Sequence, residues 1–91
     1  MPMSRIEFAN VCSLEDFYRQ LAAQTALPAH FGRNLDALFD VLTAEIAGPV
    51  TIVWHRHDTS APLLGHDDYT ALLAVLHDAA DSRPDIHLVL D

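Results

Sequence analysis

The chain has 91 residues, of which 51% are hydrophobic, and this composition is that of a globular protein, not of a disordered segment. At this length roughly 60–65% of the surface of the unfolded chain can be buried, so we expect one folded domain over residues 1–91. Thirteen Asp and Glu residues against five Lys and Arg give a formal net charge of −8, which disfavours nucleic acid and anionic lipid as partners and favours a cationic one.

The first predicted elements are a short strand and a helix. The strand covers residues 5–10, RIEFAN, in which Ile6 and Phe8 alternate with other residues on the opposite face. Ser13 then provides an N-cap, with an acidic residue three positions later. The apolar stripe of this helix, at the spacing i, i+3, i+4, i+7, comprises Leu14, Phe17, Tyr18 and Leu21.

A second helix is predicted after a break in the backbone. The first helix region closes at Leu27 and Pro28, and Gly32 marks the break. Asn34 can cap the second helix, which Gly48 and Pro49 end. Its apolar stripe comprises Leu35, Leu38, Phe39, Leu42 and Ile46.

The second half of the chain begins with a buried strand. Residues 50–54, VTIVW, form a continuous apolar run rich in β-branched residues, as expected for a central strand covered on both faces. Residues 55–66 read as a loop with at most one irregular helical turn around residues 61–64.

A last helix and strand complete the chain. Asp67 or Asp68 can cap the helix, and Pro84 separates it from a closing strand, DIHLVLD. The apolar positions of this helix are Tyr69, Leu72, Leu73, Leu76, Ala79 and Ala80. Because strands alternate with helices, we predict an α/β fold: a single small domain with a three-stranded parallel sheet and packed helices.

Bulk features also bear on location. Cys12 is the only cysteine, so the chain cannot form an internal disulfide, which suits a reducing compartment. The first ten residues lack the basic segment and the apolar run of roughly 7–15 residues that a signal peptide needs. Nowhere do about 18 uninterrupted apolar residues occur, so no membrane span is expected. We therefore expect a cytoplasmic protein.

The second helix carries an unusual pair of charges. Asp36 and Asp40 are four residues apart, and no Lys or Arg lies one turn on to pair with either. Like charges at this spacing destabilise an isolated helix by about 0.2–0.5 kcal/mol. Phe39 and Thr43 flank them at the border of the apolar stripe, which gives the composition of a recognition surface for a cationic partner. Periodicity alone favours the alternative that the two aspartates are a solvated helix face and that Phe39 completes the core.

The stretch LPAHFGRNLDALFDVLT, residues 27–43, resembles the barstar family, intracellular inhibitors of small secreted microbial ribonucleases. The family pattern is a Leu-Pro, an aromatic before Gly, then Asn-Leu-Asp-Ala-Leu, an aromatic and a second Asp. The resemblance continues through the strand ending in Trp54, the helix near residues 69–81 and the closing DIHLVL, so it covers nearly the whole chain in order.

The resemblance implies that this helix and the segment before it plug a ribonuclease active site rich in Lys, Arg and His. The carboxylate of Asp40 would take the place of an RNA phosphate, since both groups offer an arginine two acceptor oxygens in a plane. The partner would be a cationic secreted ribonuclease, barnase-like or a polymorphic toxin domain, bound 1:1 by a protein that is monomeric when free. The partner-binding positions that it implies are His30, Phe31, Gly32, Asn34, Leu35, Asp36, Phe39, Asp40, Thr43 and, on the later helix, Asp78.

Four positions depart from the family pattern. His30 stands where an aromatic is usual, Phe39 replaces a larger indole, Glu45 replaces a frequent large aromatic, and Asp78 is shorter than the usual Glu. Together they indicate a divergent partner surface. An acidic binding module of the same fold with another basic partner therefore stays open as an alternative.

A metal-dependent hydrolase is a third alternative. His55 and His57 alternate after a strand, where α/β proteins often place ligands, and could bind one metal. No HExxH motif accompanies them, and Gly32, Gly48 and Gly65 compose no phosphate-binding loop. We expect an inhibitor that acts by occlusion, with no catalytic residue, no metal and no cofactor.

Overall fold

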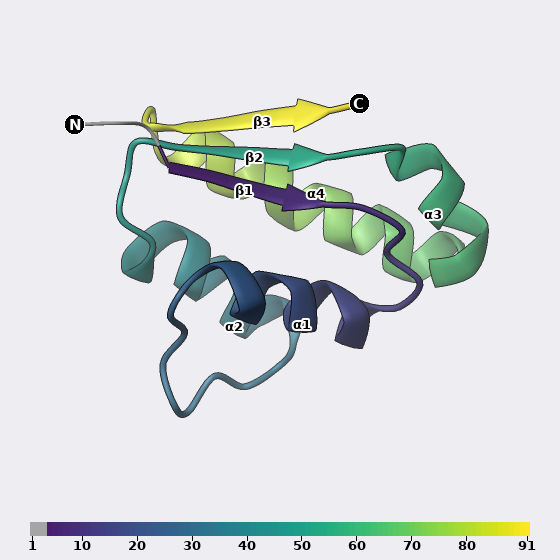
Figure 1. Cartoon of the computed structure of the whole chain (residues 1–91), viewed down its shortest axis with the longest axis horizontal. Helices are drawn as coiled ribbons and strands as arrows, with labels where there is room; N and C mark the ends of the chain where they lie inside the picture. Colours follow the sequence, from purple (N-terminus) through teal and green to yellow (C-terminus); the bar gives the residue numbers. More distant parts are fainter. Residues whose placement is uncertain (1–3) are drawn as a thin grey trace.

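A computed structural model describes residues 4–91. Three parallel strands, β1 (Ser4–Phe8), β2 (Val50–Trp54) and β3 (Ile86–Leu90), form one sheet in the order β1-β2-β3. The helices are α1 (Leu14–Gln24), α2 (Leu35–Asp40), the π-helical turn η1 (Val41–Glu45), α3 (His57–Leu64) and α4 (His66–Ser82). The predicted α/β class, the three parallel strands and the central position of β2 are thus confirmed (Figure 1).

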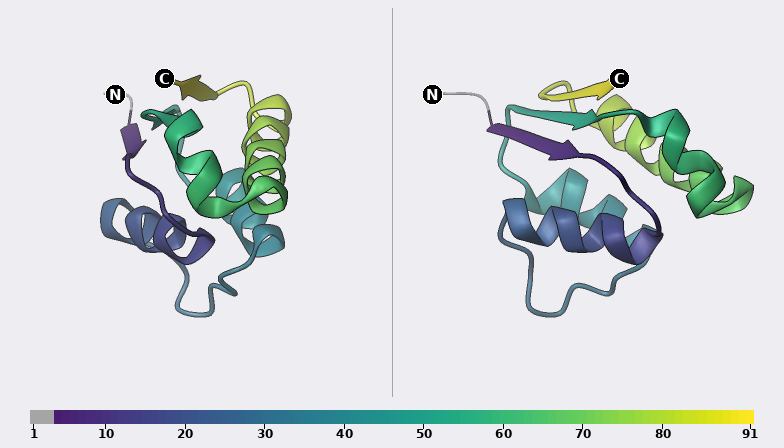
Figure 2. Two further views of the ribbon diagram at one scale, coloured as in Figure 1. Left: turned by 90° about the vertical axis from the view of Figure 1, so that its right-hand side faces the viewer. Right: turned by 45° about the vertical axis from the view of Figure 1, so that its right-hand side comes forward.

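The helices α1, α2 and α4 and the turn η1 lie on one face of the sheet, and α3 lies beyond the carboxyl ends of the strands, so the fold has two layers (Figures 1 and 2). Residues on the covered face are buried, among them Phe8, Ile52 and Trp54. The opposite face, here called the open face, carries Arg5, Glu7, Thr51, Val53, His87 and Val89. The prediction that helices cover both faces of β2 is therefore wrong. Its continuous apolar run arises because Val53, on the open face, is buried between its neighbours at 2% exposure.

Aromatic packing joins the first helix to the sheet. Phe17 of α1 stacks on Phe8 with ring centroids 3.9 Å apart, and meets Trp54 edge-on at 5.8 Å. On the other side Tyr69 of α4 meets Trp54 at 5.9 Å. Burying a large apolar side chain contributes about 1.5–3 kcal/mol, so this cluster fixes both helices on the sheet.

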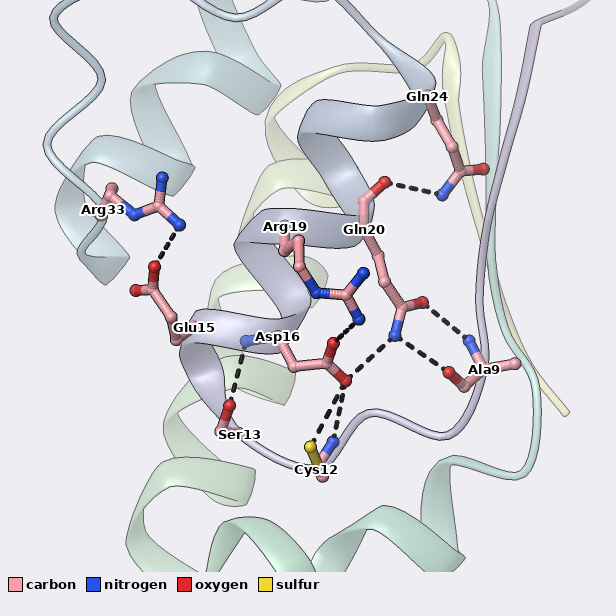
Figure 3. Close-up of polar contacts among 9 residues, drawn as sticks. All are labelled: Ala9, Cys12, Ser13, Glu15, Asp16, Arg19, Gln20, Gln24 and Arg33. Carbon is pink, nitrogen blue, oxygen red and sulfur yellow. Dashed lines mark hydrogen bonds and ion pairs between the residues drawn. The ribbon is translucent and has the colours of Figure 1, made fainter.

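The first helix is positioned by polar contacts at its start (Figure 3). The Ser13 hydroxyl accepts a hydrogen bond from the Asp16 backbone N–H at 3.0 Å, which confirms the predicted N-cap. Asp16 is buried, and its carboxylate accepts hydrogen bonds from Cys12, Arg19 and Gln20. Burial opposes the ionisation of Asp16, but these donors outweigh it and lower the pKa.

Two glutamines of α1 bond the outer edge of β1. The Gln24 amide accepts from the Glu7 backbone N–H at 2.8 Å and donates to the Glu7 carbonyl oxygen at 2.7 Å. The Gln20 amide makes the same pair of bonds to Ala9, at 3.2 and 3.0 Å. These side chains satisfy the backbone groups of Glu7 and Ala9 that point away from β2.

The second predicted helix is divided in two. Asn34 caps α2 as predicted, since its Oδ1 accepts from the Ala37 N–H at 2.8 Å. After Asp40 the turn widens, with the Ile46 N–H donating to the Val41 carbonyl oxygen at 3.0 Å. Both Val41 and Leu42 are buried there. The predicted apolar stripe of this helix included Leu42 but not Val41, so that prediction was incomplete.

Several predicted boundaries were wrong. Residues 55–66 are not a loop, because α3 occupies most of this segment. The last helix begins after Gly65 with no side-chain cap, so neither Asp67 nor Asp68 fills that role. The first helix ends at Gln24, before Leu27, and β1 ends at Phe8, before the predicted end at residue 10.

Candidate functional site: an acidic groove beside α2

The segment before α2 sets the direction of that helix. The Asn34 side-chain amide donates to the Gly32 carbonyl oxygen at 3.3 Å while its oxygen caps α2. A Cβ on Gly32 would lie 3.0 Å from the Asn34 side-chain nitrogen, so a larger residue would press on the cap. Phe31 meets Tyr18 of α1 edge-on, with ring centroids 5.6 Å apart. The chain thus enters α2 in a fixed orientation.

A groove of about 350 Å³ runs between α2 and α4. Its apolar lining is Leu35, Phe39 and Val75, and its carboxylates are Asp36, Asp40 and Asp78. The structure therefore brings the later-helix residue Asp78 to the pair on α2, across about 40 residues of sequence. We call these six residues the α2–α4 groove.

The three carboxylates of the α2–α4 groove are exposed to solvent. No ion pair or side-chain hydrogen bond engages Asp36, Asp40 or Asp78 within residues 4–91. Asp36 lies in the first turn of α2, where the helix dipole stabilises a negative charge. A groove with an apolar floor and three unpaired carboxylates has the chemistry to accept a guanidinium or ammonium group.

Two further hollows flank α2. One, of about 180 Å³, lies toward the preceding segment and is lined by Pro28, His30, Phe31, Gly32, Ala37, Asp40, Val41 and Glu45. The other, of about 450 Å³, lies toward α1 and is lined by Leu14, Glu15, Tyr18, Arg33, Asn34, Leu35 and Asp36. The exposed side of α2 is therefore a ridge between hollows: Asp36 borders the α2–α4 groove and the hollow toward α1, and Asp40 borders the α2–α4 groove and the hollow toward the preceding segment.

The predicted site residues fall into two groups. Nine of the ten line at least one of the three hollows, and the exception is Thr43 on η1, whose hydroxyl donates to the Phe39 carbonyl oxygen at 2.7 Å. Phe39 is half-buried, so it contributes to the core as well as to the groove. The contribution of Phe39 to the core is thus confirmed, and its role in partner binding stays a prediction.

Three of the residues that border the hollows but were not predicted as site residues are Val75, Glu15 and Arg33. Val75 forms part of the floor, and its position three residues before Asp78 on one helix face was the available signal. Glu15 and Arg33 form an ion pair (Figure 3), and Asp36 lines the same hollow as both of them. No spacing rule links Glu15 to Arg33, which are 18 positions apart.

The two histidines that were considered as possible metal ligands have different partners. His55 bonds Glu7 through Nε2 at 2.7 Å and Asp91 through Nδ1 at 3.1 Å. The His57 Nδ1 instead lies 2.6 Å from the Tyr69 hydroxyl. Over residues 4–91, no group of three or more His, Cys, Asp or Glu side chains is arranged to hold a metal ion. No helix in that range is both long and apolar enough to cross a bilayer.

Comparison with known proteins gives a consistent result. The family described as "Barstar (barnase inhibitor)" matches residues 1–91. A Bacillus subtilis (strain 168) protein named "Putative ribonuclease inhibitor YrdF" is 35% identical over 81 residues, which are 87% of this chain and 82% of that protein. With the parallel three-stranded sheet and its packed helices, these matches establish that the chain belongs to the barstar family.

Proposed function

We propose that the protein is a stoichiometric inhibitor of a small cationic microbial ribonuclease. Membership of the barstar family supports inhibition of a ribonuclease in general. The observation that carries the specific mechanism is the α2–α4 groove with its unpaired carboxylates of Asp36, Asp40 and Asp78. The protein acts by occlusion and catalyses no reaction.

The proposed mechanism depends on the cationic groups in the active site of the ribonuclease. A ribonuclease active site must present cationic groups to RNA phosphates, and those groups are left unpaired when RNA is absent. A carboxylate on a rigid ridge can enter such a cleft and accept two hydrogen bonds from an arginine, as a phosphate does. Asp40, which borders both the α2–α4 groove and the hollow beside His30, is the residue that we assign to this position.

The proposed mechanism explains why Asp36 and Asp40 lie side by side on α2 although their charges repel. This repulsion destabilises the free helix by about 0.2–0.5 kcal/mol. In the complex both charges face cations, so the repulsion is relieved there. We propose a 1:1 complex of a free monomer, formed in the cytoplasm of the producing cell before the ribonuclease is secreted, which makes the protein an immunity protein or antitoxin.

The experiment is a titration of RNA cleavage. A barnase-type ribonuclease, preferably one encoded beside this gene, is assayed with increasing native protein and with Asp40→Ala. We expect complete inhibition near one equivalent of native protein and its loss in the folded variant. Full cleavage in the presence of excess native protein would refute inhibition of that enzyme.

The second candidate is an acidic module of the same fold that binds a different basic protein. The specific observation in its favour is that Glu45, which departs from the family pattern, lines a hollow together with Asp40 and His30. A partner matched to this surface would present an additional cation there. Binding of a basic protein that lacks ribonuclease activity, lost in Asp40→Ala, would select this candidate over the first.

A further inference from the structure

Arg33 is a cation on the border of an otherwise acidic surface. It is the only Lys or Arg between Arg19 and Arg56 in the sequence. Its backbone is left-handed, with φ of 52°, and it stands directly before the N-cap of α2. A cationic partner that approaches α2 therefore meets this guanidinium close to Asp36.

Two carboxylates lie around the hollow that Arg33 lines. One belongs to Glu15 of α1 and the other to Asp36 of α2. The guanidinium is ion-paired with Glu15 (Figure 3), and Asp36 has no partner within residues 4–91. The Arg33 and Glu15 side chains are 50% and 65% exposed, so this contact forms in solvent and can exchange without unfolding.

We propose, on the basis of the function proposed above, that Glu15 is a positioning residue for partner binding: it holds Arg33 away from Asp36 and so keeps that carboxylate open to a cation of the partner.

The physical reason is a competition within the molecule. A guanidinium pairs with any carboxylate within reach, and Asp36 follows Arg33 by three residues at the same hollow. An attached group competes with a free partner at a high effective concentration. Without Glu15, Arg33 would occupy Asp36 and act as an internal inhibitor of the binding surface. Glu15 lies on α1, outside the ridge that meets the partner, and acts only through Arg33.

The test in the complex is a double-mutant cycle against the barnase-type ribonuclease of the titration. The variants are Glu15→Gln, Arg33→Ala and the two combined, and the association rate and Kd are measured by stopped-flow mixing. We expect Glu15→Gln to weaken binding roughly fivefold, the scale of one surface ion pair. Arg33→Ala should not weaken binding. Glu15→Gln should have little further effect once Arg33 is absent.

A matched control separates this role from loss of net charge. Asp58→Asn on α3 removes the same charge outside the three hollows. If Glu15→Gln acts only through net charge, it will match Asp58→Asn and keep its effect in the Arg33→Ala background, which would overturn the proposal. The proposal would also be overturned if Arg33→Ala weakened binding as much as Glu15→Gln does. Such a result would mean that the ion pair itself orders the segment before α2 or contacts the partner.

A measurement on the free protein keeps the proposal testable whatever the partner proves to be. NMR cross-relaxation is recorded from the Arg33 side chain to Glu15 and Asp36. We expect contacts to Glu15 in the native protein and to Asp36 in Glu15→Gln. An Arg33 side chain that contacts neither residue in the variant would refute the competition, whereas failure of inhibition alone would refute only the proposed function.

Discussion

Arg83 donates two hydrogen bonds to the Asp85 carboxylate, from Nε at 2.9 Å and from Nη2 at 2.8 Å. Its remaining nitrogen, Nη1, donates to the carbonyl oxygens of Leu42 and Ile46 at 2.9 and 2.7 Å. These carbonyls lie at the end of η1, where no further turn can satisfy them. One side chain thus connects the turn before β3 to the end of the helix that carries the proposed site.

Replacing Arg83 should therefore destabilise the fold. A hydrogen bond with a charged partner contributes about 1.5–3 kcal/mol, and we expect Arg83→Ala to lower the free energy of unfolding by about 2–3 kcal/mol in urea denaturation. Arg83→Lys keeps the charge but lacks the planar fork, so it should recover only part of the loss. Stability of Arg83→Ala equal to that of the native protein would show that the four contacts contribute nothing net.

The pH dependence of stability should report on the contacts of His55. Hydrogen bonds to Glu7 and Asp91 raise the pKa of His55 above its usual 6.5, and the bond to His55 lowers the pKa of Glu7 below 4.5, with a further contribution from Arg5 at 3.3 Å. The contribution of His55 to the free energy of unfolding is fully present below pH 6.5 and is lost as the pH rises through the raised pKa of His55. The Glu7 contribution is present above pH 4.5 and is lost as pH falls through the lowered pKa.

The difference in stability between the native protein and His55→Gln should therefore be greatest between about pH 4.5 and 6.5. Chemical denaturation at several pH values measures it. Because these groups are exposed, the difference should shrink in 1 M salt. A difference that grows steadily toward pH 9 would contradict the assigned contacts.

The like charges on α2 predict opposite effects on stability and binding. Asp40→Asn removes the repulsion with Asp36, so thermal unfolding should show equal or slightly higher stability, by about 0.2–0.5 kcal/mol. The same variant should inhibit the ribonuclease more weakly. A clear loss of stability would mean that Asp40 has a structural role, and its effect on binding would then need another explanation.

The buried carboxylate of Asp16 should contribute more to the stability of the fold than the exposed carboxylate of Glu15. Asp16→Ala leaves the donors of Cys12 and Gln20 without their acceptor, and we expect a loss of about 1–3 kcal/mol in urea denaturation. Glu15→Ala removes an acidic residue from the same first turn, so it controls for the helix dipole, and its effect should stay below 1 kcal/mol. Equal losses in the two variants would contradict a role for burial.

Charge steering should make complex formation depend on salt. With a net charge of −8 and a cationic ribonuclease, the association rate should fall steeply as ionic strength rises, while dissociation changes less. Stopped-flow mixing at several salt concentrations measures both rates. An association rate that is indifferent to salt would count against an electrostatic encounter.

The agreement between sequence and structure follows from local chemistry. Ser13 and Asn34 were predicted as N-caps, because a short polar side chain can satisfy free backbone N–H groups only at such positions. The strand at 50–54 was predicted from its β-branched residues. Asp78 was predicted to belong to the same site as Asp36 and Asp40 only because of the family resemblance. No local sequence pattern links α2 to α4.

The errors have physical causes as well. The helix α3 contains Pro62 and few apolar residues, so its periodicity is weak, and it forms because Ser60 and Leu64 are buried against the rest of the protein. Gly65 replaces the expected aspartate cap because its φ of 88° allows an abrupt turn between two helices. Tertiary packing thus decided α3, and the left-handed backbone of Gly65 decided where α4 begins.

The glutamine contacts along β1 affect how molecules meet one another. An edge strand normally offers free N–H and C=O groups to a strand of another molecule, and such pairing leads to aggregation. Here Gln20 and Gln24 already occupy those groups at Glu7 and Ala9 with four hydrogen bonds. A second chain could pair with Glu7 and Ala9 at this edge only after displacing both glutamine side chains, so β1 is protected there against adding a strand from another molecule.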